Sequence, residues 1–218
     1  MKSIVILISG RGSNMEALLD ARLPARVAAV ISNRPGAQGL AIAAARGVPT
    51  AVLDHHAFAG REAFDGALAA EIGRHEPDLV VLAGFMRVLG EEFVHRFEGR
   101  LLNIHPSLLP LFPGLHTHRR ALAAGVRLHG CSVHFVTSDL DGGPIVIQAA
   151  VPVLQGDDEE TLAARVLAQE HRIYPQAVRW FLEGRLRFGS GGRLRVDTPE
   201  DAGAFLISPA LAMETKGG

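Results

Sequence analysis

Residues 4–19 of the 218-residue chain read IVILISGRGSNMEALL, an apolar run followed by a glycine-rich turn and a helix-forming segment. The apolar run, Ile4–Ile8, shows no polar alternation, which is typical of a strand buried on both faces in a parallel sheet. It ends after five residues at Ser9-Gly10, and no small-residue cleavage site follows a longer run, so it is not a signal peptide. The sequence therefore predicts a strand, a tight turn and a helix at the start of the chain.

The same alternation continues through the first half of the chain. Apolar strands are predicted at Arg26–Ile31, Thr50–Leu53, Leu79–Ala83 and Leu101–Ile104, and helices at Pro35–Arg46, Phe58–Arg74 and Glu91–Phe97. Strands and helices that alternate with short links indicate an α/β, Rossmann-like fold, with a mostly parallel twisted sheet and helices on both faces.

The second half has a different pattern. Residues 106–118 contain three prolines and one glycine and are predicted to form a loop. The later elements are predicted to be strands at Ser132–Val136 and Ile145–Val153, a long helix at Thr161–Leu182, and a short hairpin of Arg185–Phe188 with Arg193–Val196. The last residues, Met213–Gly218, are expected to be frayed.

Composition narrows the class of protein. The chain carries 22 Lys+Arg against 23 Asp+Glu, a net charge of −1, so it lacks the basic excess expected of a nucleic-acid binder. The sequence contains no stretch of 18 apolar residues, so no transmembrane helix is predicted. The single cysteine, Cys131, excludes an internal disulfide and fits the reducing cytoplasm. The length of 218 residues predicts one domain, or one domain with an appendage.

Three polar breaks follow predicted strands, at Ser9–Asn14, Gly84–Arg87 and Asn103–Pro106. Because ligands bind beyond the carboxyl ends of parallel strands, we expect these breaks to line one cleft. The first break suits a phosphate, since a glycine-rich turn at a helix N-terminus presents free N–H groups. It matches neither the dinucleotide fingerprint, because Met15 replaces the third glycine, nor the P-loop. A tight turn with Ser13 or Asn14 as a helix cap is the alternative.

The third break places an amide and an imidazole side by side. Strand alternation sends Asn103 and His105 to the same side of their strand. An amide can stabilise a developing oxyanion while an imidazole exchanges a proton near neutral pH, which suits attack on a carbonyl. Asp141, in a distant polar turn, would stabilise an imidazolium if it lay near His105. A structural histidine and an ordinary turn aspartate are the alternatives.

Metal and thiol chemistry are disfavoured. His116 and His118 form an H-x-H pair with His129 and His134 nearby, but no carboxylate stands at ligand spacing, and we expect no metal. Cys131 opens an apolar strand and lacks a nucleophile motif.

Taken together, these segments resemble the phosphoribosylglycinamide formyltransferases of purine biosynthesis. The resemblance runs in order over residues 1–187. It is carried by ISGRGSN at 8–14, AGFMRVL at 83–89, LLNIHPSLLP at 101–110, FPGLHTH at 112–118, HGCSVHFVTSDLDGGP at 129–144, QEH at 169–171 and Tyr174-Pro175.

The resemblance implies transfer of a formyl group from 10-formyltetrahydrofolate, as co-substrate, to the amine of glycinamide ribonucleotide. It implies catalytic roles for Asn103, His105 and Asp141, a phosphate contact by Gly12, Ser13 and Asn14, and a contact of Glu170 with the same substrate. Arg61, the segment Met86, Arg87, Val88 and Leu89, and Asn103 would hold the folate, with its pterin under the 137–143 turn. The expected catalytic domain spans residues 1–188, with a phosphate-binding half (about 1–100) and a folate and catalytic half (about 101–188), followed by a hairpin and tail at 189–218.

Some features depart from the pattern. Arg11 stands in the phosphate loop where a small polar residue is expected, and the tail after Phe188 matches nothing in the family. The alternatives are a formyltetrahydrofolate deformylase-like hydrolase and, from another class, a non-catalytic nucleotide-binding module. A methionyl-tRNA formyltransferase would need a further tRNA-binding domain. The expected partners are the two small-molecule substrates, with no nucleic acid and no membrane, for a monomer or a homodimer.

Overall fold

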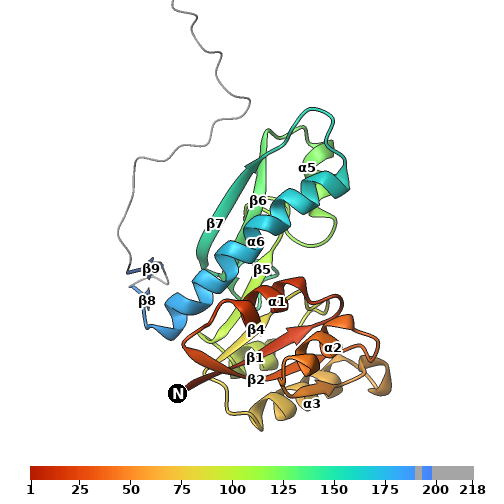
Figure 1. Ribbon diagram of the computed structural model, residues 1–218, viewed down its shortest axis with the longest axis vertical. Helices are drawn as coiled ribbons and strands as arrows, with labels where there is room; N and C mark the ends of the chain where they lie inside the picture. Colours follow the sequence, from red (N-terminus) through yellow and green to blue (C-terminus); the bar gives the residue numbers. More distant parts are fainter. Residues whose placement is uncertain (190–192, 198–218) are drawn as a thin grey trace, which may run out of the picture.

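The computed structural model describes residues 1–189 and 193–197 and shows one seven-stranded sheet with helices around it (Figure 1). The strands are β1 (Lys2–Ile8), β2 (Ala25–Ser32), β3 (Thr50–Val52), β4 (Leu79–Leu82), β5 (Leu101–His105), β6 (Leu128–Phe135) and β7 (Ile145–Pro152). Their spatial order is β3-β2-β1-β4-β5-β6-β7. The pairs from β3 to β5 are parallel, and β6 and β7 are antiparallel. The predicted mostly parallel sheet is confirmed.

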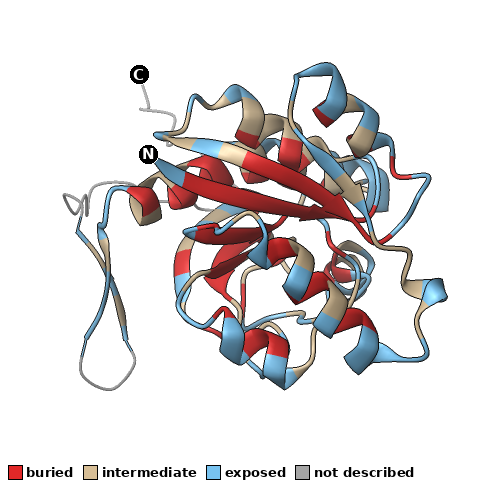
Figure 2. Ribbon diagram, turned by 90° about the horizontal axis from the view of Figure 1, so that it is seen from below, coloured by how far each residue is buried: buried red, intermediate tan, exposed pale blue. Residues whose placement is uncertain are grey.

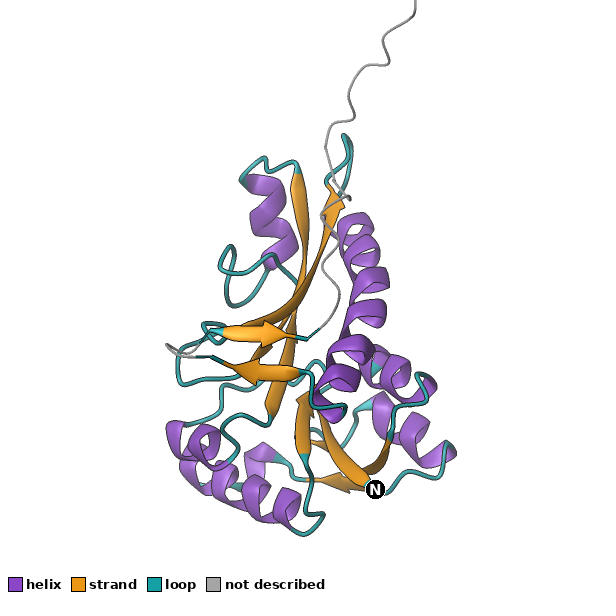
Figure 3. Cartoon of the chain, turned by 90° about the vertical axis from the view of Figure 1, so that its left-hand side faces the viewer, coloured by secondary structure: helices purple, strands orange, loops and turns teal. Residues whose placement is uncertain are grey.

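Helices cover both faces of the sheet (Figure 3). Residues of α1 (Ser13–Asp20), α2 (Gln38–Ala45) and α6 (Glu159–Leu182) share one buried core with Ile4, Ile6 and Ile8. Residues of α3 (Arg61–Gly73) and α4 (Glu91–Arg96) share the other core with Val5 and Leu7. A single-turn 3-10 helix, η1 (His55–Ala57), precedes α3, and α5 (Thr117–Ala123) packs beside α6. Because β1 supplies alternate residues to the two cores, it is buried along almost its whole length (Figure 2).

The crevice of the sheet lies at the carboxyl ends of β1 and β4. From β1 the chain winds outward to β2 and β3, then returns to build β4 and β5 on the other side of β1. At such a switch the connections diverge and leave room for a ligand. The loops that begin at Ser9 and Ala83 therefore face each other at this point.

The long helix α6 is fixed to the sheet by a buried tyrosine. The Tyr174 hydroxyl lies 2.8 Å from the Leu82 carbonyl oxygen and 3.1 Å from that of Leu102. Tyr174 is completely buried, and a buried hydroxyl needs such partners. The contact holds α6 against β4 and β5 and places Glu170, one turn earlier on the same face, over the start of α1.

Two sequence-based boundaries in the second half were wrong. The predicted loop 106–118 ends sooner, because α5 begins at Thr117. Strand β6 begins at Leu128, four residues before the predicted start. The early part of β6 contains Gly130, where an added Cβ would lie 2.0 Å from the Ala149 oxygen, so a residue typical of turns is here required by close strand packing.

The hairpin at the end of the described chain is confirmed, with β8 (Leu186–Phe188) antiparallel to β9 (Leu194–Val196). The expected fraying of Met213–Gly218 and most of the 189–218 tail lie outside the described residues. In the part of the chain that the structure describes, no helix combines the length and apolar character needed to cross a bilayer.

Candidate active site

The turn after β1 requires glycine at position 12. Gly12 has φ +83° and precedes α1, and an added Cβ would lie 2.9 Å from the Gly39 Cα atom. The Gly39 N–H donates to the Gly10 carbonyl at 3.1 Å, which ties the turn to the start of α2. No side chain caps α1, so the alternative that Ser13 or Asn14 serves as the cap is wrong. The first-turn N–H groups of α1 have no intrahelical acceptors and can bind an anion.

Asn14 turns toward α6 and meets Glu170. Its Nδ2 donates to Glu170 Oε2 at 2.7 Å, and both side chains are buried. Burial raises the pKa of Glu170, and the Asn14 hydrogen bond partly opposes the shift. Asn14 Oδ1 is buried without a partner. The hydrogen bond therefore joins the turn, with the three residues predicted to bind the phosphate, to Glu170. Asn14 Oδ1 and the Glu170 carboxylate can accept hydrogen bonds from hydroxyl groups of a ligand next to the turn.

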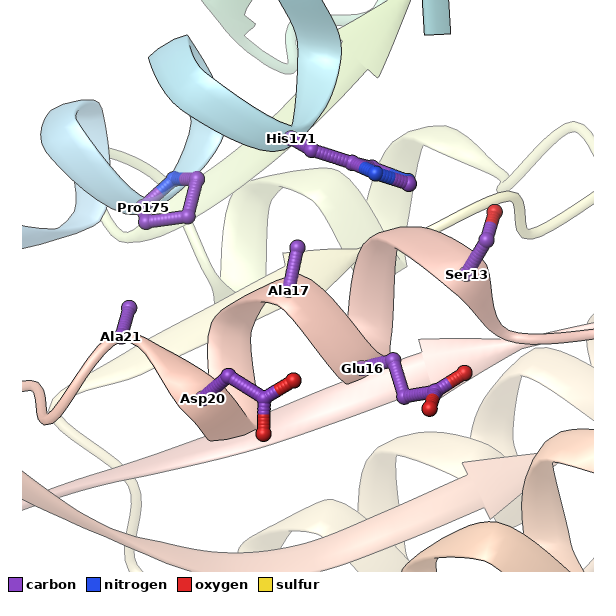
Figure 4. A pocket seen from close by; sticks show the side chains of 7 residues that line it. All are labelled: Ser13, Glu16, Ala17, Asp20, Ala21, His171 and Pro175. Atoms are coloured by element: carbon purple, nitrogen blue, oxygen red, sulfur yellow. The ribbon is translucent and has the colours of Figure 1, made fainter. Parts of the chain in front are cut away.

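A groove of about 450 Å³ runs from this turn between α1 and α6 (Figure 4). It is lined by Ser13, Glu16, Ala17, Asp20, Ala21, His171 and Pro175. Glu16 and Asp20 are paired with Arg46 at 3.1 and 2.6 Å and line the side of the groove that α1 forms. The end with Ser13 and His171 adjoins the turn.

A second cluster lies at the end of β5. His105 Nδ1 is 3.4 Å from Asp141 Oδ2, and His105 Nε2 is 3.0 Å from the Phe112 carbonyl oxygen. Both ring nitrogens therefore face oxygen acceptors, which is the arrangement that suits an imidazolium. The side chains of His105 and Asp141 are 7% and 9% exposed. The structure thus brings together two predicted residues that the sequence could not place near each other.

Asp141 is itself held by the backbone. Its Oδ2 accepts the Gly114 N–H at 2.8 Å, and its φ of +52° lies in the left-handed region that Asp tolerates better than most residues. The loop after β5 and the turn before β7 are thereby joined through the carboxylate.

His134 holds Asn103 and was missed as a site residue by the sequence analysis, which weighed it only as a metal ligand. His134 pairs with Asn103 in the antiparallel register of β6 with β5. Its Nδ1 lies 2.9 Å from the Phe135 carbonyl, which can only accept, so Nδ1 carries the proton. Its Nε2 then accepts from Asn103 Nδ2 at 3.1 Å. Burial lowers the pKa of His134, so the ring is neutral at pH 7. Strand alternation was the available signal in the sequence, because it places Ser132 and His134 on the same side of their strand.

Other candidate groups have structural partners. His129 Nε2 is 3.2 Å from His118 Nδ1, and burial first, then the His118 charge, lowers the pKa of His129 to about 4. Burial raises the pKa of the Cys131 thiol to about 12, so it is a poor nucleophile. Within residues 1–189 and 193–197, one group of three possible metal ligands lies close together, Asp54, His55 and His56, and it includes none of the histidines at 116–134.

The predicted folate segment follows β4 at the crevice. Met86 and Val88 are 62% and 55% exposed, so their side chains are available to a ligand. The Arg87 guanidinium lies over the Phe64 ring, 5.1 Å from its centroid. Arg61 is the first residue of α3 and is exposed, and its charge opposes the raised pKa of Asp65 beside the segment.

Comparisons with known proteins agree with these observations. Residues 2–178 match the family described as formyl transferase. The chain is 54% identical over 189 residues to phosphoribosylglycinamide formyltransferase of Escherichia coli K12, with 85% of this chain and 89% of that protein covered. It is 44% identical over 195 residues to the human trifunctional purine biosynthetic protein adenosine-3, covering 88% of this chain and 19% of that longer protein.

Solved structures give the same match. The glycinamide ribonucleotide transformylase 1 of Symbiobacterium toebii superposes with a TM-score of 0.87 at 52% identity, covering 90% of this chain and 94% of that one. The phosphoribosylglycinamide formyltransferase of Coxiella burnetii gives 0.86 at 47% identity, covering 90% and 93%.

Proposed function

Because the chain belongs to the formyl transferase family, we propose that it transfers the formyl group of 10-formyltetrahydrofolate to the amine of glycinamide ribonucleotide. The products are formylglycinamide ribonucleotide and tetrahydrofolate, and the reaction belongs to de novo purine biosynthesis. The observation that carries the proposal is the 3.4 Å contact of His105 with Asp141 beside Asn103, the arrangement expected for chemistry at a formyl carbon.

The ribonucleotide binds at the turn after β1. The N–H groups of Gly12, Ser13 and Asn14, which form the free N-terminus of α1, bind its phosphate. Glu170 accepts from its hydroxyls, which explains why a carboxylate with a raised pKa is kept in a buried position.

The folate binds along the segment Met86–Leu89, with Arg61 at its exposed end and its pterin under the 137–143 turn. The exposed apolar side chains of Met86 and Val88 suit a planar heterocycle, and the backbone of the segment offers N–H and C=O groups to it. The donor supplies a formyl carbon attached to a nitrogen that can leave.

The reaction begins when the substrate amine attacks the formyl carbon and negative charge develops on the formyl oxygen. Asn103 Nδ2 donates the hydrogen that His134 does not accept, and a protonated His105 donates from Nε2, which exchanges the Phe112 carbonyl for the formyl oxygen. Asp141 stabilises the imidazolium through Nδ1, and His134 fixes the Asn103 amide, so the donors are oriented before charge develops. His105 or an ordered water then carries the proton from the amine to the donor nitrogen, and the bond between that nitrogen and the formyl carbon breaks as the formyl C=O forms again.

The partners in this proposal are the two small-molecule substrates, in the cytoplasm, with no nucleic acid or membrane. A deformylase-like hydrolase would use water in place of the amine, and a non-catalytic module would not need Asn103, His105 and Asp141 together. The buried Asn14–Glu170 pair favours the ribonucleotide over water, because a hydrolase has no use for a second substrate pocket.

A spectrophotometric assay of tetrahydrofolate formation tests the proposal. The purified protein is supplied with 10-formyltetrahydrofolate, with and without glycinamide ribonucleotide. Product that forms only with the ribonucleotide is the expected result. Equal product without it would establish a hydrolase, and ribonucleotide binding without product would establish a binding module.

A further inference from the structure

The segment Phe85–Gly90 is held at both ends by buried side chains from distant parts of the chain. Near its start, the Met86 N–H donates to Ser9 Oγ at 2.8 Å. At its end, the Gly90 N–H donates to Asp65 Oδ2 at 2.7 Å. Ser9 is 4% exposed and Asp65 is 6% exposed, so neither side chain is positioned to meet a ligand in solvent.

Ser9 joins three loops at the crevice. Its hydroxyl donates to Asn33 Oδ1 at 2.6 Å, which leaves an oxygen lone pair for the Met86 N–H. Ser9 follows β1, Asn33 follows β2 and Met86 follows β4. One buried hydroxyl therefore sets the distance between the phosphate turn and the segment that follows β4.

Asp65 fixes the other end at a cost in stability. Its Oδ1 is buried without a partner, and an added Cβ on Gly90 would lie 3.0 Å from its Oδ2. Burial raises the pKa of Asp65, while the Gly90 N–H and the charges of Arg61 and Arg87 oppose the shift. A buried carboxyl with an unpaired oxygen is destabilising, and such groups are found where a site requires them.

Between the two anchors burial holds only part of the segment, because Leu89 packs against the core and Arg87 lies over the Phe64 ring. Met86 and Val88 direct apolar side chains to solvent, and their conformation depends on the backbone that carries them. The backbone between Met86 and Val88 is therefore fixed mainly by its hydrogen bonds to Ser9 and Asp65.

We propose that Ser9 and Asp65 are positioning residues for the formyl donor, which hold the backbone of Met86–Leu89 in the conformation that binds it. The inference rests on the proposed function and extends it to two residues that touch neither substrate. Loss of either anchor releases the segment, so more of the binding free energy of the donor is spent on ordering it. Chemistry at His105 is unchanged once the donor is bound.

Steady-state kinetics with both substrates test the inference. Asp65→Ala removes the acceptor of the Gly90 N–H, and Asp65→Asn keeps an acceptor oxygen there. Ser9→Ala removes the acceptor of the Met86 N–H. Ser3→Ala is the matched control, since Ser3 is a buried serine at the opposite end of β1, 7% exposed, whose hydroxyl donates to the Glu76 carbonyl.

We expect Asp65→Ala and Ser9→Ala to raise the KM for 10-formyltetrahydrofolate about tenfold, with kcat at saturating donor within about threefold of wild type. Asp65→Asn and Ser3→Ala keep the KM of the wild type within about threefold. An unchanged KM for the donor in both alanine variants, with only a lower melting temperature, would overturn the inference. A KM in Asp65→Asn as high as in Asp65→Ala would overturn it for Asp65.

Two further arms keep the result interpretable. If Asp65→Ala does not fold, Ser9→Ala carries the same test. If the wild type transfers no formyl group, the proposed function fails by itself, and calorimetric titration of tetrahydrofolate into the same variants still measures whether the anchors control its affinity.

Discussion

The phosphate turn and the catalytic cluster, the two ends of the proposed site, are built in different ways. At the phosphate turn, consecutive residues after β1 create the site, because Gly12 sets the backbone and the start of α1 supplies the N–H groups. At the catalytic cluster, Asn103, His105, His134 and Asp141 come from β5, β6 and the turn before β7. The first end depends on local conformation and the second on strand register.

This difference predicts a division of labour between binding and chemistry. A site made of backbone N–H groups can bind an anion but has no group that exchanges a proton. A cluster of imidazole, amide and carboxylate side chains can stabilise charge and move a proton. Substitutions at the cluster should therefore change kcat, and substitutions at the phosphate turn should change KM and stability.

The largest effect is expected at His105. In His105→Ala, loss of an oxyanion donor and of the proton carrier lowers kcat by at least about a hundredfold. Circular dichroism and thermal melting check that the fold survives. A kcat close to that of the wild type would remove His105 from the mechanism.

Asp141→Asn should have the next largest effect. The amide keeps an oxygen for the Gly114 N–H but no longer stabilises the imidazolium. We expect kcat to fall about tenfold and the pH–rate profile to change, because the carboxylate that balances the imidazolium charge is lost. A profile that coincides with the wild type would show that the carboxylate only holds the loop.

His134 tests whether the Asn103 amide must be held. His134→Phe removes the acceptor of Asn103 Nδ2, whereas His134→Gln retains an acceptor oxygen. We expect kcat to fall about tenfold in the first variant and about threefold or less in the second. Equal loss in both variants would mean that packing, and not the hydrogen bond, explains the effect.

Glu170→Gln is expected to act at the phosphate end, with opposite effects on stability and binding. Glutamine can accept from Asn14 Nδ2 and donate to the unpaired Asn14 Oδ1, which adds about 1 kcal/mol or about 2–4 °C in melting temperature. The KM for the ribonucleotide should rise several-fold, because a carboxylate that accepts from hydroxyls is lost.

The pH dependence of that stability difference has a definite sign. Burial raises the pKa of Glu170 in the folded protein, so wild-type stability contributed by this group is present at low pH and declines as pH rises through the folded pKa. The advantage of Glu170→Gln should therefore grow as pH rises. Thermal melts of both proteins from pH 4 to 8 measure it, and an advantage that shrinks with pH would contradict the explanation.

The sequence predicted what local patterns determine. Ile4–Ile8 predicted the first strand, because a strand buried on both faces is apolar throughout. The glycines that follow predicted the phosphate turn, because a residue with positive φ is usually glycine. The resemblance named Asn103, His105 and Asp141, and alternation placed the first two on one side of a strand. Asp141 comes close to them because β6 and β7 pair antiparallel with β5 and with each other, and no local sequence pattern specifies that pairing.

The remaining misses have physical reasons. Thr117 begins a helix within a proline-rich region, and Gly130 lies in a strand because β7 packs too close for a side chain. Ser9 and Asp65 are ordinary residue types whose importance comes from hydrogen bonds to distant groups, namely Asn33 and the Met86 N–H for Ser9 and the Gly90 N–H for Asp65. Such contacts become visible only when the fold is known.

Calorimetric titration of glycinamide ribonucleotide into His105→Ala and Glu170→Gln tests the division between the two ends most directly. The account predicts that His105→Ala binds the ribonucleotide within about threefold of the wild-type Kd, while Glu170→Gln binds it several-fold more weakly. The reverse order, with binding lost in His105→Ala and retained in Glu170→Gln, would contradict it.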